Sequence, residues 1–412
     1  MTRNGSSASL PLGFRWGATT AGIKASGKPD VAIAVADQPA IAAAMFTSNQ
    51  FVAAPILIGQ RHLKATEHKM RAVLVNAGNA NCATGDPGLE HCRQSCAAMG
   101  DAIGCVFDEV FPSSTGIIGV PLPIEKLVAG IPKAVAALGN TPDHADAFAH
   151  AIMTTDTKPK VASESFEIDI AGEVKRVSLW GCCKGAGMIG PKLANAAPHA
   201  TMLVYLFTDI AASASQLKEI LHDSVEKSFN AISVDGDMST NDTVLLLASG
   251  ASGVALDANI TNEFDAALQR VCDSLAYQVV DDGEGVTHVV TLQLTGAASD
   301  EAAATMAKSI ANSPLVKTAW SSGDPNWGRL LAAAGKAGVP FDPATVTIAI
   351  GGLEVFANGV RSAAWDETAT HERMSQRHYT IAINFGMGSG TCKFVTCDLT
   401  HEYVSINADY ST

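Results

Sequence analysis

The chain has 412 residues, 47% of them apolar, which is material for roughly two to three closely packed domains. Its 28 basic and 41 acidic residues give a net charge of −13, so the basic surface that attracts nucleic acid or an anionic membrane is absent. No apolar stretch has the length of a membrane-spanning helix, and the first residues lack the apolar core of a secretory signal. We therefore expect a cytoplasmic protein with neither nucleic acid nor membrane as a partner.

Strand-like and helical segments alternate irregularly, which predicts an α/β protein. In chain order we expect strands at 71–75 and 106–111, a helix at 124–138, a strand at 202–207, a helix at 214–229, a strand at 243–248, a helix at 262–280, a strand at 288–294 and a helix at 300–312. The stretch 378–407 carries three strand-like runs, YTIAINF, KFVTCDL and EYVSINA, and a Gly-rich turn. A loop rich in Gly, Pro and Ala, residues 184–200, leads directly into the strand expected from Thr201.

The nine cysteines are an odd number scattered through a long chain, which is not a disulfide framework. Cys92 and Cys96 lie one helical turn apart, and Cys392 and Cys397 flank an expected strand, but neither pair forms a C-x-x-C metal motif. We expect reduced, mostly buried thiols.

The Ala200–Thr201 junction has two interpretations. A threonine hydroxyl is a weak nucleophile that needs a nearby base. If the peptide bond before Thr201 breaks, the new α-amine, with an ordinary pKa of about 7.7 to 8.0, can accept the hydroxyl proton. The same residues are also the ordinary start of a buried strand, and the local sequence leaves both interpretations open.

Gly- and Thr-rich motifs run along the whole chain. They are VNAGNANCATG at 75–85, SSTGIIG at 113–119, AIMTTDTKPK at 151–160, KGAGMIGP at 184–191, HATML at 199–203, FNAISVDGDMSTNDT at 229–243, VVDDGEG at 279–285, SPLVKTAWSSGDPNWGRL at 313–330 and CDLTHEYVSINADYST at 397–412. In this order they resemble the ornithine acetyltransferase family, the glutamate N-acetyltransferases of arginine biosynthesis. The resemblance extends from about residue 12 to the last residue and implies a role for each matching position.

The first set of matches concerns the acyl-transfer chemistry. The resemblance implies that Thr201 is the nucleophile and that Ala200–Thr201 is the bond cut in self-processing. Thr115 and Gly116 match the pair that forms the oxyanion hole. A glycine in a turn there would let backbone N–H groups approach the developing anion closely, although the same residues read alone are an ordinary turn after the strand at 106–111.

The second set of matches concerns substrate binding. Lys184 matches a lysine that binds a carboxylate, and Glu284 matches an acidic residue that accepts from a substrate amine. Read alone, both are ordinary surface residues. Asn407 and Thr412 match a pair that closes the site from the C-terminus, where chains are usually frayed.

Two further matches leave details open. In the MTTDT motif one hydroxyl is expected to contact substrate, with Thr154 slightly favoured over Thr155. The loop between Lys184 and Thr201 is longer than in the family pattern. Loop length is tolerated thermodynamically, but the insertion leaves the placement of Lys184 and the efficiency of self-cleavage open.

Three aspartates in VDGDMSTND (235, 237 and 242) have the chemistry of a Mg²⁺ or Ca²⁺ site, but not the EF-hand spacing. The family that the chain resembles needs no metal. We therefore expect neither a metal nor a cofactor, with acetyl-CoA a candidate co-substrate.

The resemblance implies an α/β fold, a layered α-β-β-α-type sandwich, made of fragments 1–200 and 201–412 that assemble as α2β2 or larger. It implies transfer of acetyl from N-acetylornithine to glutamate through an acetyl-threonine, giving ornithine and N-acetylglutamate. Two alternatives stay open. One is a self-processing aminopeptidase, and the other is an uncleaved small-molecule binding protein without enzymatic activity.

Overall fold

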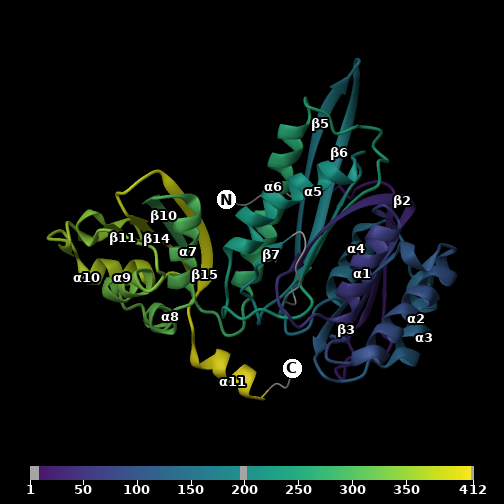
Figure 1. The fold of residues 1–412 in the computed structure, drawn as a ribbon, viewed down its shortest axis with the longest axis horizontal. Coiled ribbons are helices and arrows are strands. Elements are labelled where there is room, and N and C mark those ends of the chain that lie inside the picture. Colours follow the sequence, from purple (N-terminus) through teal and green to yellow (C-terminus); the bar gives the residue numbers. More distant parts are fainter. Residues whose placement is uncertain (1–8, 195–201, 410–412) are drawn as a thin grey trace.

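The computed structural model describes residues 9–194 and 202–409, and two β-sheets organise these parts of the chain (Figure 1). The first sheet joins β1 (Phe14–Thr19), β2 (Val31–Thr47), β3 (Lys69–Asn79), β4 (Val110–Ile117), β5 (Lys160–Ile170), β6 (Glu173–Lys184), β7 (Leu193–Ala194), β8 (Leu203–Thr208) and β9 (Thr243–Ala248). The second sheet joins β10 (Val289–Ala297), β11 (Thr347–Ile350), β12 (Leu353–Ala357), β13 (Val360–Arg361), β14 (His378–Asn384) and β15 (Gly390–Cys397).

Strands from distant parts of the sequence alternate in the first sheet. Its strand order is β4-β3-β2-β9-β8-β6-β5, and β1 and β7 also pair with β2. β8 runs parallel to β9 and antiparallel to β6, while β2 and β9 are antiparallel. Every residue of β8 (LVYLFT) and of β9 (TVLLLA) is buried. Both faces of this sheet must therefore be covered.

Helices contact this sheet and provide that cover. They are α1 (Ala54–Ala65), α2 (Gly85–Ile103), α3 (Ile124–Ala136), α4 (Pro142–Ala151), α5 (Ala214–Lys227) and α6 (Thr261–Asp281). The later helices are α7 (Asp300–Ala311), α8 (Pro314–Ser321), α9 (Trp327–Gly335), α10 (Glu367–Met374) and α11 (His401–Asp409), and the short 3-10 turns are η1 (Phe107–Glu109), η2 (Phe229–Ala231) and η3 (Pro343–Thr345). None of the helices in the described part is long and apolar enough to cross a membrane.

Side chains alternate between two cores along the central strands. Leu206 of β8 packs in one core with α5 and α6, while its neighbour Phe207 packs in the opposite core with α4. α6 contacts β5 and β6 of the first sheet and also β15 of the second, and Figure 1 shows it between the sheets. Helices α7 and α9 share a core with the second sheet. The expected layered α/β class is confirmed.

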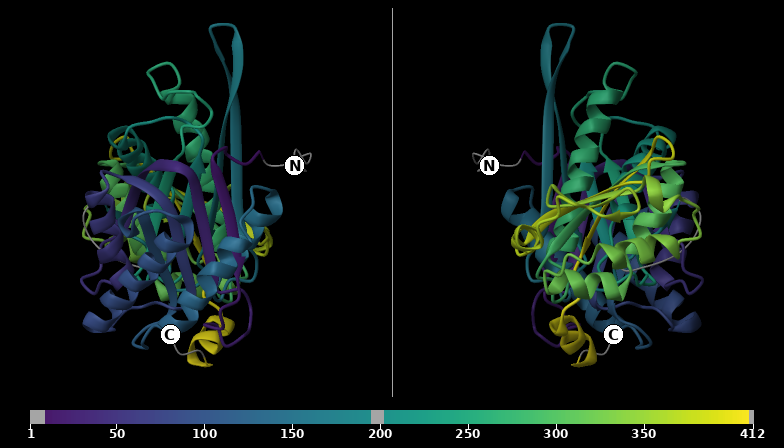
Figure 2. Two further views of the ribbon diagram at one scale, coloured as in Figure 1. Left: turned by 90° about the vertical axis from the view of Figure 1, so that its right-hand side faces the viewer. Right: turned by 90° about the vertical axis from the view of Figure 1, so that its left-hand side faces the viewer.

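Strands β5 and β6 form a long hairpin that projects from the body of the molecule (Figure 2). Ala171 and Gly172 at its tip both have positive φ, +56° and +87°, as a tight two-residue hairpin turn requires. The other end of the hairpin lies inside the molecule, where Lys160 pairs with Cys183 and both are buried. The hairpin therefore delivers Lys160 and Lys184 to the interior.

The helices and strands expected between 71 and 312 are present, but the structure corrects three details. Residues 107–109 are a 3-10 turn and the strand is Val110–Ile117, so the Ser-Thr-Gly segment ends a strand and is not a turn after it. Parallel pairing with β3 extends β4 through the Ser-Thr-Gly segment to Ile117. The loop 184–200 contains the short strand β7, because Leu193 and Ala194 pair with β2.

The run EYVSINA, expected as a strand, is helical and forms most of α11. Its valine and isoleucine favour a strand, but at this point the chain has left the second sheet (Figure 1). A strand there would need a neighbour to satisfy its backbone groups, whereas a helix satisfies most of its own.

Candidate active site

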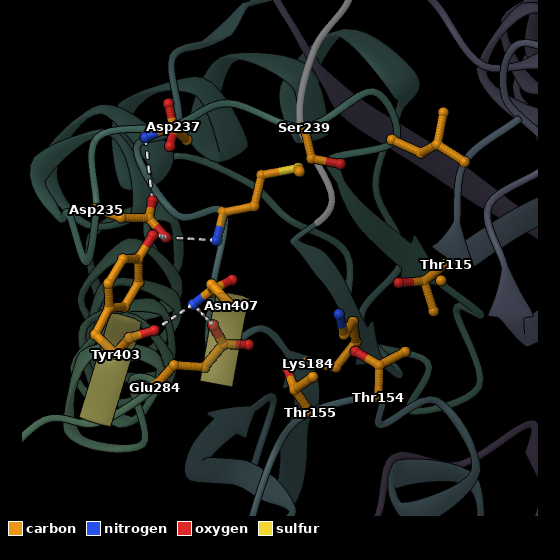
Figure 3. Close-up of a pocket in the computed structure, with 14 residues that line it drawn as sticks. Thr115, Thr154, Thr155, Lys184, Asp235, Asp237, Ser239, Glu284, Tyr403 and Asn407 are labelled. Atoms are coloured by element: carbon orange, nitrogen blue, oxygen red, sulfur yellow. Dashed lines mark hydrogen bonds between the residues drawn. The ribbon is translucent and has the colours of Figure 1, made fainter. Parts of the chain in front are cut away.

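One pocket collects most of the residues singled out by the motifs (Figure 3). Its lining consists of Thr115, Gly116, Ile118, Thr154, Thr155, Lys184, Gly187, Met188, Asp235, Asp237, Ser239, Glu284, Tyr403 and Asn407. The expected oxyanion pair, both candidate threonines and three expected substrate-binding residues therefore share one cavity. Ala200, Thr201 and Thr412 lie outside the described residues.

Gly116 lies at the end of β4, where the two parallel strands β3 and β4 come unusually close. It pairs with Gly78 and has a φ of +132°, a backbone conformation that side chains disfavour. A Cβ at this position would lie 2.3 Å from the carbonyl carbon of Gly78. Only glycine fits here, and Gly116 lines the pocket together with Thr115.

Lys184 is the last residue of β6 and is only 4% exposed. It pairs with Leu203 of β8, so it stands beside the start of the strand that follows the expected nucleophile. The long loop before Thr201 therefore does not displace this lysine from the pocket. Burial lowers the pKa of Lys184, while the Asp156 carboxylate nearby raises it and favours the ammonium form.

Glu284 and Asn407 meet on another side of the pocket, together with Tyr403 (Figure 3). The Asn407 side-chain amide donates to Glu284 Oε2 at 2.9 Å and to the Tyr403 carbonyl at 3.0 Å. The backbone N–H of Glu284 donates to the Ala186 carbonyl at 2.9 Å. The glutamate is thus tied to both the C-terminal helix and the segment after Lys184, and its Oε1 accepts no hydrogen bond from the residues that the structure describes.

Asp235 and Tyr403 are site residues whose roles the sequence did not reveal. Asp235 accepts the backbone N–H groups of Met188 at 2.7 Å and Ile189 at 2.9 Å, and the Tyr403 hydroxyl at 3.2 Å. Burial raises the pKa of Asp235. These contacts make it the anchor of the segment after Lys184. Its partners are distant in sequence, so the spacing of the aspartates, which suggested a metal, could not indicate this role.

Asp242 has different surroundings from Asp235. It is fully buried, and neither carboxylate oxygen has a hydrogen-bond partner in the part of the chain that the structure describes. The next residue, Thr243, donates its N–H to the Met202 carbonyl at 2.9 Å, which places Asp242 near the start of β8. Burial raises the pKa of Asp242, and Lys184 lowers it. Within the described ranges, no three His, Cys, Asp or Glu side chains are grouped as a metal site.

Comparison with known proteins identifies the family. The ArgJ family model matches residues 15–412. The "Arginine biosynthesis bifunctional protein ArgJ" of Nitratidesulfovibrio vulgaris is 42% identical over 97% of this chain and 98% of its own length. Its Thermus thermophilus counterpart is 43% identical over 98% of this chain and 99% of its own length. The chain belongs to the ArgJ family. The resemblance inferred from the motifs is thereby confirmed.

Two crystal structures are similar to parts of this chain. One is the arginine biosynthesis bifunctional protein of Bacillus halodurans, 38% identical over 51% of this chain and all of that chain, with a TM-score of 0.49. The other is the ornithine acetyltransferase of Mycobacterium tuberculosis complexed with ornithine. It is 37% identical over 45% of this chain and 94% of that chain, with a TM-score of 0.39.

Proposed function

We propose that this ArgJ-family protein transfers an acetyl group from N2-acetyl-L-ornithine to L-glutamate through an acetyl-threonine intermediate. The observation that carries the proposal is the pocket itself. The pocket contains Glu284 and the buried Lys184, whose opposite charges suit the amine and the carboxylate of an amino acid. Gly116 at the end of β4 lines the same pocket, and Lys184 pairs with Leu203 at the start of β8. The curated relatives' shared name, which specifies arginine biosynthesis, supports a role in that biosynthesis.

Before the transfer reaction, the Ala200–Thr201 peptide bond is hydrolysed. Water supplies the OH that completes the Ala200 carboxyl group and the proton that makes the Thr201 nitrogen a free α-amine. This amine takes the hydroxyl proton as Thr201 attacks the acetyl carbonyl of acetylornithine. The backbone N–H groups at Thr115 and Gly116 stabilise the oxyanion. The C–N bond of the amide then breaks, the α-amine returns the proton to the departing ornithine nitrogen, and the acetyl group stays on Thr201 as an ester. Glutamate takes it by the reverse sequence.

The other site residues hold the amino-acid substrate. The Lys184 ammonium binds its carboxylate, and Glu284, supported by Asn407, accepts from its amine. Thr154 is favoured over Thr155 for a hydroxyl contact with substrate. Thr412 closes the pocket from the C-terminus. Both substrates share an amino-acid backbone, so one set of groups can position either.

Several finer features belong to the same proposal. The active protein consists of fragments 1–200 and 201–412, assembled as α2β2 or larger, and acts in the cytoplasm. It needs no cofactor. Acetyl-CoA is a candidate second acetyl donor, in agreement with the word "bifunctional" in the relatives' names.

A transfer assay on the purified protein tests the proposal. Acetylglutamate formed from acetylornithine is measured for the wild type, for Thr201→Ala and for Thr305→Ala, which alters an exposed threonine of α7. Loss of the nucleophile should lower kcat at least about a thousandfold, and the control should retain full activity. Normal transfer by Thr201→Ala would contradict the proposal. Release of amino acids from peptides without acetyl transfer would favour the aminopeptidase alternative.

A further inference from the structure

A lysine without solvent contact lies between two aspartates next to the pocket. Lys160, near the start of β5, is 0% exposed. Its Nζ lies 2.6 Å from Asp156 Oδ1 and 2.5 Å from Asp282 Oδ2. Lysines are almost never fully buried, and removing such a group from water offsets much of what its ion pairs contribute to stability. The network therefore calls for an explanation other than stability.

Asp156 fixes the backbone of two segments that line the pocket. Its Oδ2 accepts the N–H of Thr154 at 2.9 Å, and its Oδ1 accepts the N–H of Gly185 at 2.7 Å. Thr154 lines the pocket, and Gly185 directly follows Lys184, which also lines it. One carboxylate thus sets the distance between the threonine segment and the lysine.

Asp282 connects the same network to the opposite side of the pocket. It directly follows α6 and lies two positions before Glu284. It accepts the N–H of Thr157 at 3.1 Å and also the Thr157 hydroxyl. Lys160 bridges Asp156 and Asp282, so a continuous set of charged contacts runs from the backbone beside Lys184 to the segment that carries Glu284.

We propose that Asp156, Lys160 and Asp282 are positioning residues that fix the separation of Lys184 and Glu284, the two groups that hold the amino-acid substrate. The inference rests on the proposed function and deepens it. Asp156 and Lys160 precede the proposed cleavage bond and Asp282 follows it. The network is therefore also a buried ion-pair contact between the two fragments, and it maintains the geometry of the binding site after the covalent link is cut.

The network also acts on the charge of Lys184. Among the residues that the structure describes, the ionisable groups that act on this lysine are Lys24, Asp156, Lys160, Cys183, Asp242 and Glu284. Asp156 raises the pKa of Lys184 and Lys160 lowers it. Lys184 must be an ammonium to bind a carboxylate, so substrate affinity is lost as the pH rises through its pKa. Neutralising Asp156 should shift this alkaline loss to lower pH, and neutralising Lys160 should shift it to higher pH.

The chain offers a matched control for the network. Lys158 and Asp281 form an ion pair between the same two segments, two residues from Lys160 and one residue from Asp282. Lys158 Nζ lies 2.8 Å from Asp281 Oδ2, but the Lys158 side chain is half exposed. An exposed pair of this kind contributes little. Lys158→Met therefore removes a lysine–aspartate contact from the same place without disturbing the buried network.

The experiment measures kcat, KM for both substrates and their pH dependence on the full-length processed enzyme. The variants are Lys160→Met, Asp282→Asn, Asp156→Asn and the control Lys158→Met. For the first two, KM for acetylornithine and for glutamate should rise about tenfold, the loss that corresponds to about 1.4 kcal/mol of binding, with kcat changed less than KM. Lys158→Met should match the wild type. The alkaline limits of Asp156→Asn and Lys160→Met should shift in opposite directions.

A milder variant keeps the test decisive if a buried charge change prevents folding. Thr157→Val replaces only the hydroxyl that Asp282 accepts, and it should raise both KM values in the same direction by a smaller factor. Wild-type KM and pH limits in Thr157→Val and in the folded network variants would overturn the inference. A wild-type enzyme that neither cleaves nor transfers acetyl would instead overturn the proposed function, so the two failures are distinguishable.

Discussion

Two glycines set how closely segments approach in the site, and they differ in what surrounds them. A Cβ at Gly116 would meet the backbone of Gly78, which cannot move aside. A Cβ at Gly187 would lie 2.3 Å from Glu284 Oε2, the end of a flexible side chain. Gly187 has no positive φ, so a side chain there costs no backbone strain. Substitution at Gly187 should therefore displace the Glu284 carboxylate and leave the fold intact.

For Gly187→Ala we expect KM for acetylornithine to rise about tenfold, because the displaced carboxylate no longer meets the substrate amine. The melting temperature should stay within about 3 °C of the wild type. Steady-state kinetics and thermal denaturation check both expectations. Gly335→Ala at the end of α9 is the control, since its Cβ would meet nothing within 4 Å. An unchanged KM in Gly187→Ala would show that the Glu284 position does not govern binding.

Residues with a motif were predictable from the sequence, and residues that act through distant partners were not. Lys184 and Glu284 could be singled out because each stands in a short motif, and the structure brings both to one pocket. Asp235 stands in a motif too, but its partners are the backbone groups at 188–189 and the hydroxyl of Tyr403. Such contacts depend on the fold, and no local spacing indicates them.

Helix α11 shows how an element can serve the site without contributing to the core. None of its residues is buried, yet Tyr403 donates to Asp235 and Asn407 donates to Glu284. Its stabilising contacts are few and polar, so its removal should affect substrate binding more than folding.

We expect deletion of residues 401–412 to leave the melting temperature within about 3 °C of the wild type. KM for both substrates should rise at least about tenfold, because Glu284 loses its amide partner. Ser405→Ala is the control, since the bond that this hydroxyl makes among the described residues lies within the helix, to the His401 carbonyl. Differential scanning calorimetry and initial-rate kinetics give the two readouts. A deletion variant with wild-type KM values would remove α11 from the binding site.

Burial decides which elements the sequence reveals. β8, β9 and α5 were expected close to their observed bounds, because the cores they enter enforce apolar runs or a helical apolar face. α11 was taken for a strand because it has no buried face to impose a helical period. The end of β4 was taken for a turn because its pairing with β3 is a long-range contact.

At the scale of the whole molecule, the two proposed fragments are interleaved in one sheet. β2 and β6 precede the proposed cleavage bond, and β8 and β9 follow it. β9 pairs with β2, and β8 pairs with β6, so backbone hydrogen bonds join the fragments on both sides of the central pair. Cutting the chain before Thr201 therefore breaks no strand pairing among the residues that the structure describes. The cleaved protein should keep its fold and its pocket.

The central claim, that Thr201 becomes a free N-terminus and carries the acetyl group, is tested most directly by the mass of the denatured protein after incubation with acetylornithine alone. We expect two fragments. The one whose sequence begins Thr201-Met202-Leu203 should be heavier by one acetyl group and should lose it when glutamate is added. A single uncut chain that still transfers acetyl, or an acetyl group found on the other fragment, would contradict transfer through an N-terminal Thr201.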